Sequence, residues 1–415
     1  MLRPAARPRR SGWLPPAVAV VACLLVIAPE PGAADAPDRL TDVEFWHLVT
    51  ELSEAGGAFH SDNFTSNESG FAEAAARLAA RPAGGAYLGV GPEQNFSYIV
   101  ASRPRIAFIL DIRRQAVAQH LLFKAIFELS ADRAAFLARL FSRPRPDVPP
   151  DASTRELWEA LERAGADDAV FRENRAAVEA HLLRTHGFAL DPADLASIDY
   201  VYHAFFALGP HINYAGYQQR LTTGNVDFQK LTLALDGAGV ARSFLGTEAN
   251  YQAIRAMQLA NLVVPVRGDF AGPKSLGAIG EYLRAHDLRL RTFYVSNVEQ
   301  YLFGWSVARE VDENGGWQRF YATLATLPID PDSVLLRESL SRSAVPCRIA
   351  GFLEAVADGR VSSQAEARRC PGGTTAPIGG ARDTVAGPLA GPVPGPAGGT
   401  AAESAGAHFS RRSPL

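Results

Sequence analysis

The chain has 415 residues, of which 47% are hydrophobic and 20% charged, with a formal net charge of -3. This composition is typical of a globular protein and excludes collagen-like, coiled-coil and wholly disordered chains. A net charge so close to zero gives no electrostatic reason to expect nucleic-acid binding, so we predict no nucleic-acid partner. The sequence also lacks the Gly-x-Ser-x-Gly motif of many serine hydrolases and the His-Glu-x-x-His motif of zinc proteases.

The N-terminus has the layout of a secretory signal peptide. Four arginines lie between Arg3 and Arg10, an apolar run extends from Leu14 to Ala28, and small residues follow. The apolar run of about 15 residues is shorter than the ~20 needed to span a bilayer comfortably. We therefore predict that residues 1–36 are a signal peptide or an N-terminal membrane anchor, and that the protein is exported, periplasmic or envelope-anchored. Val20–Cys23 resembles a lipobox, so lipidation of Cys23 is an alternative.

The C-terminal region divides into a short extension and a tail. Residues 346–370 form the extension, and export would allow Cys347 to pair with Cys370 in an oxidising compartment, although two unrelated thiols fit the sequence equally well. Residues 371–415 are dominated by Gly, Pro, Ala, Ser and Thr. Such a segment buries too little apolar surface to offset its conformational entropy, so we predict a disordered tail.

Residues 37–345 carry the patterns of one α/β domain. The sequence predicts two leading helices, the first over residues 40–60 and ended by Gly56-Gly57, the second at Phe71–Arg81. A β-α-β-α unit follows, with strands at 86–91 and 106–110 and helices at 93–102 and 113–129. After a mostly helical stretch over about residues 131–258, the rhythm returns with a strand at 262–266, a helix at 275–286 and a strand at 292–295. We expect a Rossmann-like, open, mostly parallel sheet with a large helical insertion between its two halves.

Polar or glycine residues follow each predicted strand. Ligands of open α/β sheets bind outside the carboxyl ends of the strands, so these residues are the candidate site. They are Gly89, Gly91, Glu93, Asn95, Asp111, Arg113, Asp269 and Asn297.

The spacing from Gly91 to Asp111 is 20 residues, the distance at which an acid accepts hydrogen bonds from the ribose of nucleoside ligands. The glycines would let the backbone approach the ligand closely. Glu93 occupies the place of a third glycine, where it would repel a pyrophosphate, so an uncharged or cationic ligand is favoured. The alternative is a tight strand-to-helix turn without a ligand.

Weaker signals lie outside this set. The polar loop Asp62–Glu68 is interpreted either as a lid over the crevice or as an Asx-rich capping loop. His120 and Lys124 are interpreted as surface residues. His181 and His186 are five apart on a predicted helix, the wrong spacing for a metal pair, and we expect no metal site. His203 and His211 are likewise interpreted as structural.

Four segments carry a resemblance to known proteins. Tyr87–Asn95, Phe108–Gln115, Gly268–Pro273 and Ser296–Phe303 are similar to the blocks of an uncharacterised bacterial family. More loosely, the layout resembles class I S-adenosylmethionine-dependent methyltransferases, although Tyr87 stands where those enzymes usually carry an acid and no Asn-Pro-Pro-Tyr motif follows the strand before Asp269.

The looser resemblance implies S-adenosylmethionine as the cofactor of a methyltransferase-like protein of unknown substrate. It implies that Gly89 and Gly91 contact the methionine moiety, that Asp111 binds the ribose, and that Asp269 lies by the transferred methyl. We expect Glu93, Asn95 and Arg113 to complete the cofactor site and Asn297 to join Asp269 in catalysis. Because the methyl donor is cytosolic, the signal peptide supports an alternative: an exported or envelope-anchored, non-catalytic protein that binds a nucleoside or another small molecule.

Overall fold

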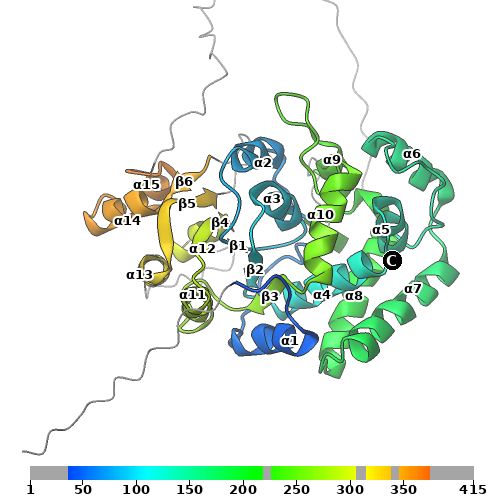
Figure 1. The fold of residues 1–415 in the computed structure, drawn as a ribbon, viewed down its shortest axis with the longest axis horizontal. Coiled ribbons are helices and arrows are strands. Elements are labelled where there is room, and N and C mark those ends of the chain that lie inside the picture. Colours follow the sequence, from blue (N-terminus) through cyan, green and yellow to red (C-terminus); the bar gives the residue numbers. More distant parts are fainter. Residues whose placement is uncertain (1–35, 218–225, 305–314, 338–344, 374–415) are drawn as a thin grey trace, which may run out of the picture. The chain divides into compact units, whose positions relative to one another are not determined.

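The computed structural model describes residues 36–217, 226–304, 315–337 and 345–373 (Figure 1). The predicted leader up to residue 35, its Cys23, and the predicted tail from residue 374 onward lie outside the described residues. The first three residues assigned to the tail are described, and the Gly373 carbonyl accepts a hydrogen bond of 2.7 Å from the backbone N–H of Arg348. No helix in the described ranges is long and apolar enough to cross a membrane.

The described residues contain a six-stranded sheet with the order β3-β2-β1-β4-β5-β6. Every neighbouring pair is parallel except β5 with β6, which is antiparallel. This open, mostly parallel sheet with helices confirms the predicted Rossmann-like α/β class. The strands are β1 (Ala86–Gly89), β2 (Ile106–Asp111), β3 (Val263–Arg267), β4 (Leu290–Ser296), β5 (Ile329–Arg337) and β6 (Cys347–Arg348).

The strands form where apolar runs can be buried on both faces. All six residues of β2 are buried, as expected for a central parallel strand covered by helices on both sides. Pro265 in β3 has no N–H to donate, but β3 is an edge strand that pairs only with β2, where a proline is tolerated. The core therefore centres on β1, β2 and β4, and the sheet presents their carboxyl ends together.

The predicted helical insertion lies in the connection from β2 to β3, which are neighbours in the sheet (Figure 1). α4 packs against β3 and also against α8, and this contact with α8 connects the insertion to the sheet. The elements are α4 (Arg114–Glu128), α5 (Arg133–Leu140), α6 (Thr154–Ala164), α7 (Asp168–Ala180), the π-helical turn η1 (His181–Thr185), α8 (Pro192–Leu208), the 3-10 turn η2 (Gly209–His211), α9 (Phe228–Leu233) and α10 (Glu248–Leu259).

The remaining helices flank the strands in chain order. They are α1 (Asp42–Glu51), α2 (Phe71–Ala79), α3 (Gln94–Ser102), α11 (Ser275–Ala285), α12 (Val298–Leu302), α13 (Gly316–Thr326), α14 (Ile349–Ala357) and α15 (Gln364–Arg368). The first predicted helix was too long, because α1 ends at Glu51, before Gly56-Gly57. Ser53 and Glu54 instead bind the end of β3: Ser53 Oγ accepts from the N–H of Arg267, and Glu54 N–H donates to its carbonyl, both at 2.9 Å.

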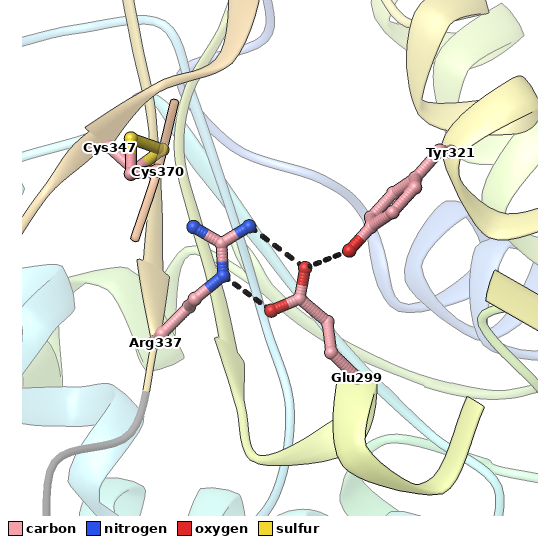
Figure 2. Close-up of a disulfide and its surroundings, with 5 residues drawn as sticks. All are labelled: Glu299, Tyr321, Arg337, Cys347 and Cys370. Carbon is pink, nitrogen blue, oxygen red and sulfur yellow. Dashed lines mark hydrogen bonds and ion pairs between the residues drawn. A yellow bond between two sulfur atoms is a disulfide. The ribbon is translucent and has the colours of Figure 1, made fainter. Parts of the chain in front are cut away.

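The predicted extension at residues 346–370 adds β6 and two helices to the sheet edge. Cys347 and Cys370 form a disulfide, so the paired alternative is the one present in the structure (Figure 2). In the same region, the guanidinium of Arg337 at the end of β5 is paired with the buried carboxylate of Glu299. Glu299 Oε1 also accepts a 2.7 Å hydrogen bond from the Tyr321 hydroxyl. The carboxylate thus ties α12 to β5 and α13.

Candidate functional site

A cavity of about 300 Å³ lies at the carboxyl ends of β1 to β4. Its position is the one where open α/β sheets bind ligands, because β1 pairs with β2 on one side and β4 on the other and the chain connections change direction there. The residues lining it from the strand ends include Gly91, Asp111, Arg113, Asp269 and Asn297. The structure therefore brings five of the eight predicted site residues together.

Gly89, Glu93 and Asn95 do not line this cavity. Asn95 is fully buried, and its Nδ2 donates to the carbonyl oxygens of Val90, Gly91 and Pro92 at 2.9, 3.2 and 2.7 Å. A Cβ at position 89 would overlap the Oδ1 of Asn95, so glycine is needed there for packing. These residues therefore shape the turn between β1 and α3 from the side that faces away from the cavity.

Gly91 forms the part of that turn that faces the cavity. Its φ of 80° is in the left-handed region, and no atom lies within 4 Å of the place where a Cβ would stand. His120 Nε2 lies 2.9 Å from the Gly91 carbonyl and donates its proton to it. Burial lowers the pKa of His120 to about 4, so the ring is neutral at physiological pH. Thus His120 and Asn95 fix the Gly91 turn.

His120 and Lys124 are both buried, which contradicts their interpretation as surface residues. α4 packs against the sheet and is also covered by helices of the insertion, so Gln119, His120 and Lys124 point into the protein. Lys124 Nζ is satisfied by Glu128 Oε1 at 2.6 Å and by the Gln258 carbonyl at 2.8 Å. The sequence predicted that His120 and Lys124 lie on a helix next to the sheet. It did not reveal that the helical insertion covers the other side of that helix.

Asp111 at the end of β2 forms a closed ion pair with Arg113. The guanidinium donates to both carboxylate oxygens, from Nε to Oδ1 at 3.0 Å and from Nη2 to Oδ2 at 2.9 Å, and the Arg113 backbone N–H donates to Oδ1 at 2.9 Å. Arg113 also donates to the carbonyls of Ser61 and Asp62. An ionised carboxylate offers about four acceptor positions, so Oδ2 of Asp111 keeps one for a ligand.

Glu93 is directed into the core rather than at the cavity. Its Oε1 accepts from the Thr65 hydroxyl at 2.5 Å and the Ser66 N–H at 3.2 Å. Within the described residues, its Oε2 is buried without a hydrogen-bond partner. Burial raises the pKa of Glu93 to about 7, and the bonds from Thr65 and Ser66 reduce that rise only in part. Glu93 therefore does not oppose a ligand in the cavity directly; it holds the loop that forms the opposite wall.

That opposite wall comes from the polar loop before α2. Asn63, Thr65, Ser66, Asn67 and Glu68 all line the cavity, so the loop lies over the crevice, as the lid interpretation requires. The alternative interpretation was an Asx-rich capping loop, whose contacts would be local. The contacts of this loop instead reach α3 and β4, which lie far along the chain.

Glu68, which the sequence placed in the candidate lid loop but not among the predicted site residues, is the main addition to the site. It is buried, and its Oε1 accepts from the Tyr294 hydroxyl at 2.5 Å and from Ser296 Oγ at 2.7 Å. Ser296 has a φ of 47°, a left-handed conformation that is uncommon outside glycine. An acid in a polar loop that precedes the first strand was the available signal, but only tertiary contacts join it to β4.

Aromatic side chains form the apolar part of the cavity. Phe59 and Tyr301 make an edge contact with ring centroids 5.2 Å apart, and the Arg113 guanidinium lies 5.8 Å from the Phe59 centroid. Phe270 and Tyr294 also line the cavity. Such a mixture of aromatic surface and a few convergent polar groups is typical of small-molecule sites.

In the part of the chain that the structure describes, the charged lining side chains are three acids, Glu68, Asp111 and Asp269, and one base, Arg113, which Asp111 already pairs. The cavity thus has a net negative lining and suits an uncharged or cationic ligand better than an anionic one. Asp269 is partly used by the turn after β3, where its Oδ1 accepts the Ala271 N–H at 2.9 Å.

A family model described as a domain of unknown function (DUF7790) matches residues 63–189 and 225–354, more than half of the chain. The chain belongs to this family. The DUF7790 match includes every strand of the sheet and all of the cavity lining except Ala58, Phe59 and Tyr214. No curated protein matches the chain.

Proposed function

We propose that the cavity binds S-adenosylmethionine or a closely similar nucleoside, and that the protein is a methyltransferase-like enzyme of unknown substrate. The observation that carries this proposal is the position of Gly91, Asp111 and Asp269 on one cavity, at the carboxyl ends of three different strands. This is the switch point of the sheet, where nucleosides bind in Rossmann-like folds.

The charges around the cavity support a cationic ligand. S-adenosylmethionine carries a sulfonium and an ammonium group against one carboxylate, whereas dinucleotides carry a pyrophosphate. The acidic lining from Glu68 and Asp269 favours the former by electrostatic complementarity. The unpaired acceptor position of Asp111 Oδ2 suits a ribose hydroxyl, and the rings of Phe59 and Tyr301 offer a surface for a purine.

The residues on the β3 and β4 side would orient a methyl acceptor. When bound, S-adenosylmethionine supplies an electrophilic methyl group, and transfer to a nucleophile then needs mainly in-line positioning. Asp269 and Asn297 line the cavity there and offer a carboxylate and an amide to hold the acceptor. Among the described residues, no cysteine and no lysine lines the cavity, which favours catalysis by positioning over a covalent enzyme intermediate.

Calorimetric titration with S-adenosylmethionine and its demethylated product tests this proposal. Asp111→Asn removes a charged acceptor worth roughly 1.5–3 kcal/mol, so affinity should fall about 10- to 100-fold. The matched control is Asp194→Asn, because Asp194 is also a buried partner of an arginine, Arg114, but lies outside the cavity. Equal losses for both variants, or binding that neither variant changes, would contradict a ribose contact at Asp111.

A second candidate is an exported binding protein that uses the same cavity without catalysis. The Cys347–Cys370 disulfide favours it, because such bonds persist in oxidising compartments outside the cytoplasm. Cell fractionation with N-terminal sequencing separates the two candidates. A mature N-terminus near residue 36 on an extracytoplasmic protein supports the binding protein, and an intact N-terminus on a cytoplasmic protein supports the methyltransferase.

A further inference from the structure

Two histidines and a glutamate converge at the C-terminal end of α4, whereas the cavity lies at its N-terminal end. His181 Nε2 and His186 Nε2 each lie 2.6 Å from Oε2 of Glu128, near the C-terminal end of α4. Among the described residues, this is the one group of three His, Cys, Asp or Glu side chains whose ligand atoms all lie within 4.8 Å of one another. The sequence prediction of no metal pair assumed an α-helix, in which residues five apart point in different directions.

The backbone departs from an α-helix at this place. α7 continues into η1, a π-helical turn over His181–Thr185, and the N–H of His186 donates to the carbonyl of His181 at 3.1 Å. Bonds between residues five apart place the side chains of those residues on one face. The two imidazole rings consequently lie 4.7 Å apart at 81° to each other. Single π turns of this kind are rare and occur frequently at functional sites.

We propose that Glu128, His181 and His186 bind a divalent transition-metal ion, with zinc as the ion that this ligand set suits best. Two imidazoles and one carboxylate are a known zinc ligand set, which leaves a fourth position for water or a further ligand. A tetrahedral zinc ion with bonds near 2.0–2.1 Å holds its ligand atoms about 3.3 Å apart. The two 2.6 Å separations between Glu128 Oε2 and the imidazole nitrogens therefore need to open by about 0.7 Å, which side-chain rotation supplies.

The groups around the cluster orient its ligands as the outer residues of metal sites do. His186 Nδ1 lies 2.7 Å from Asp42 Oδ1 and donates to it, which directs Nε2 toward the ion. Lys124 bonds to Oε1 of Glu128 and leaves Oε2 for the metal. Asn261 connects both, since its Nδ2 donates to Asp42 Oδ1 at 3.0 Å and its Oδ1 accepts from Lys124. The negative charge of Asp42 and the positive charge of Lys124 cancel each other. The negative charge of Glu128 therefore remains to balance part of the charge of the ion.

The cluster is enclosed yet reachable. The side chain of Glu128 is 3% exposed and that of His186 9%, whereas that of His181 is 16% exposed and gives the ion a path from solvent. Fifteen residues of α4 separate Glu128 from Arg113 at the cavity, about 22 Å along the helix axis. The ion would therefore not take part in chemistry at the cavity. It would join α4, the end of α7 and, through Asp42, α1.

Metal analysis and zinc titration of the full chain test the site directly. Protein produced without a polyhistidine tag is stripped with a chelator, and zinc alone is then added while bound zinc and the melting temperature are measured. We expect about one high-affinity zinc per chain and a rise of several degrees in melting temperature, since an ion that binds only the folded state stabilises it. Cobalt in place of zinc should give the visible absorption of a tetrahedral site with nitrogen and oxygen ligands.

Matched variants locate the ion. His181→Ala and His186→Ala should each weaken zinc binding at least about 100-fold, whereas His203→Ala and His211→Ala, on histidines of the same helical region, should leave it unchanged. If the ligand variants do not fold, Asp42→Asn serves instead, because Asp42 is not a ligand and its loss should weaken binding about 10- to 100-fold. A folded wild type that binds no zinc on the order of 0.1 mM, or binding that survives all of these changes, would overturn the proposal and leave an ion-pair cluster.

Discussion

Glu93→Gln tests the most unusual carboxyl group behind the cavity. The side chain is 3% exposed and its Oε2 is without a partner among the described residues, so its charged form loses water that little replaces. Glutamine has almost the same shape, and its oxygen can accept the bonds from Thr65 and Ser66. The substitution therefore removes the charge while keeping the contacts of the loop.

The size and sign of the effect follow from the pKa. Burial raises the pKa of Glu93 from 4.5 to about 7 in the folded state. A carboxyl group whose pKa is raised in the folded state stabilises the folded protein fully only at a pH below the pKa of the unfolded state. That stabilisation is lost as the pH rises through the folded-state pKa of about 7. Between pH 5 and pH 8 the wild type should therefore lose roughly 2–3 kcal/mol of unfolding free energy through this group alone.

Urea unfolding at pH 5 and pH 8 measures this difference. The gap in unfolding free energy between Glu93→Gln and wild type should move in favour of the variant by roughly 2–3 kcal/mol at the higher pH. Glu159→Gln on α6 is the control, because the Glu159 side chain is exposed and its carboxylate loses little water on folding. A gap for Glu93→Gln that stays constant to within about 0.5 kcal/mol would refute the assignment of a buried, desolvated carboxyl.

Three further predictions concern the framework of the site. Reducing the disulfide, or replacing Cys347 with serine, should lower the unfolding free energy by about 3 kcal/mol, measured by urea unfolding with and without reductant; an unchanged midpoint would contradict it. Glu299→Gln breaks the buried ion pair with Arg337 and should cost about 3 kcal/mol or more, with thermal unfolding as the readout and a silent variant as the contrary result. Gly89→Ala should cost about 1–3 kcal/mol because its Cβ overlaps Asn95, and a variant as stable as wild type would show that the turn relaxes freely.

Much of the sheet was predictable because its strands are buried on both faces. The runs that became β1 and β2 are apolar and bounded by glycine or charged residues, and Thr292–Val295 of β4 is a buried run, which is the pattern of central parallel strands. β5 was missed because it opens with Ile-Asp-Pro-Asp, a turn-like composition, and only its second half is buried. Its place in the sheet depends on β4, more than thirty residues earlier in the chain.

The position of the site was predictable, but its internal contacts were not. Strand ends predicted the places of Gly91, Asp111 and Asp269, since parallel strands bring their carboxyl ends to one edge. The inward turn of Glu93 depends on Thr65 and Ser66, 28 and 27 residues earlier, and no local pattern encodes such pairs. The meeting of His181 with His186 depends on one π-helical turn, which helical periodicity treats as an ordinary α-helix.

The most direct test of the proposed nucleoside site is native mass spectrometry of the folded, full-length protein, first as purified and then after addition of S-adenosylmethionine or its demethylated product. The proposal predicts a one-to-one complex with at least one of these nucleosides, which Gly91→Val abolishes while the protein stays folded, because a side chain at this positive-φ position would fill the wall of the cavity. A folded wild-type protein that carries neither nucleoside, and binds neither when they are supplied in excess, would contradict it.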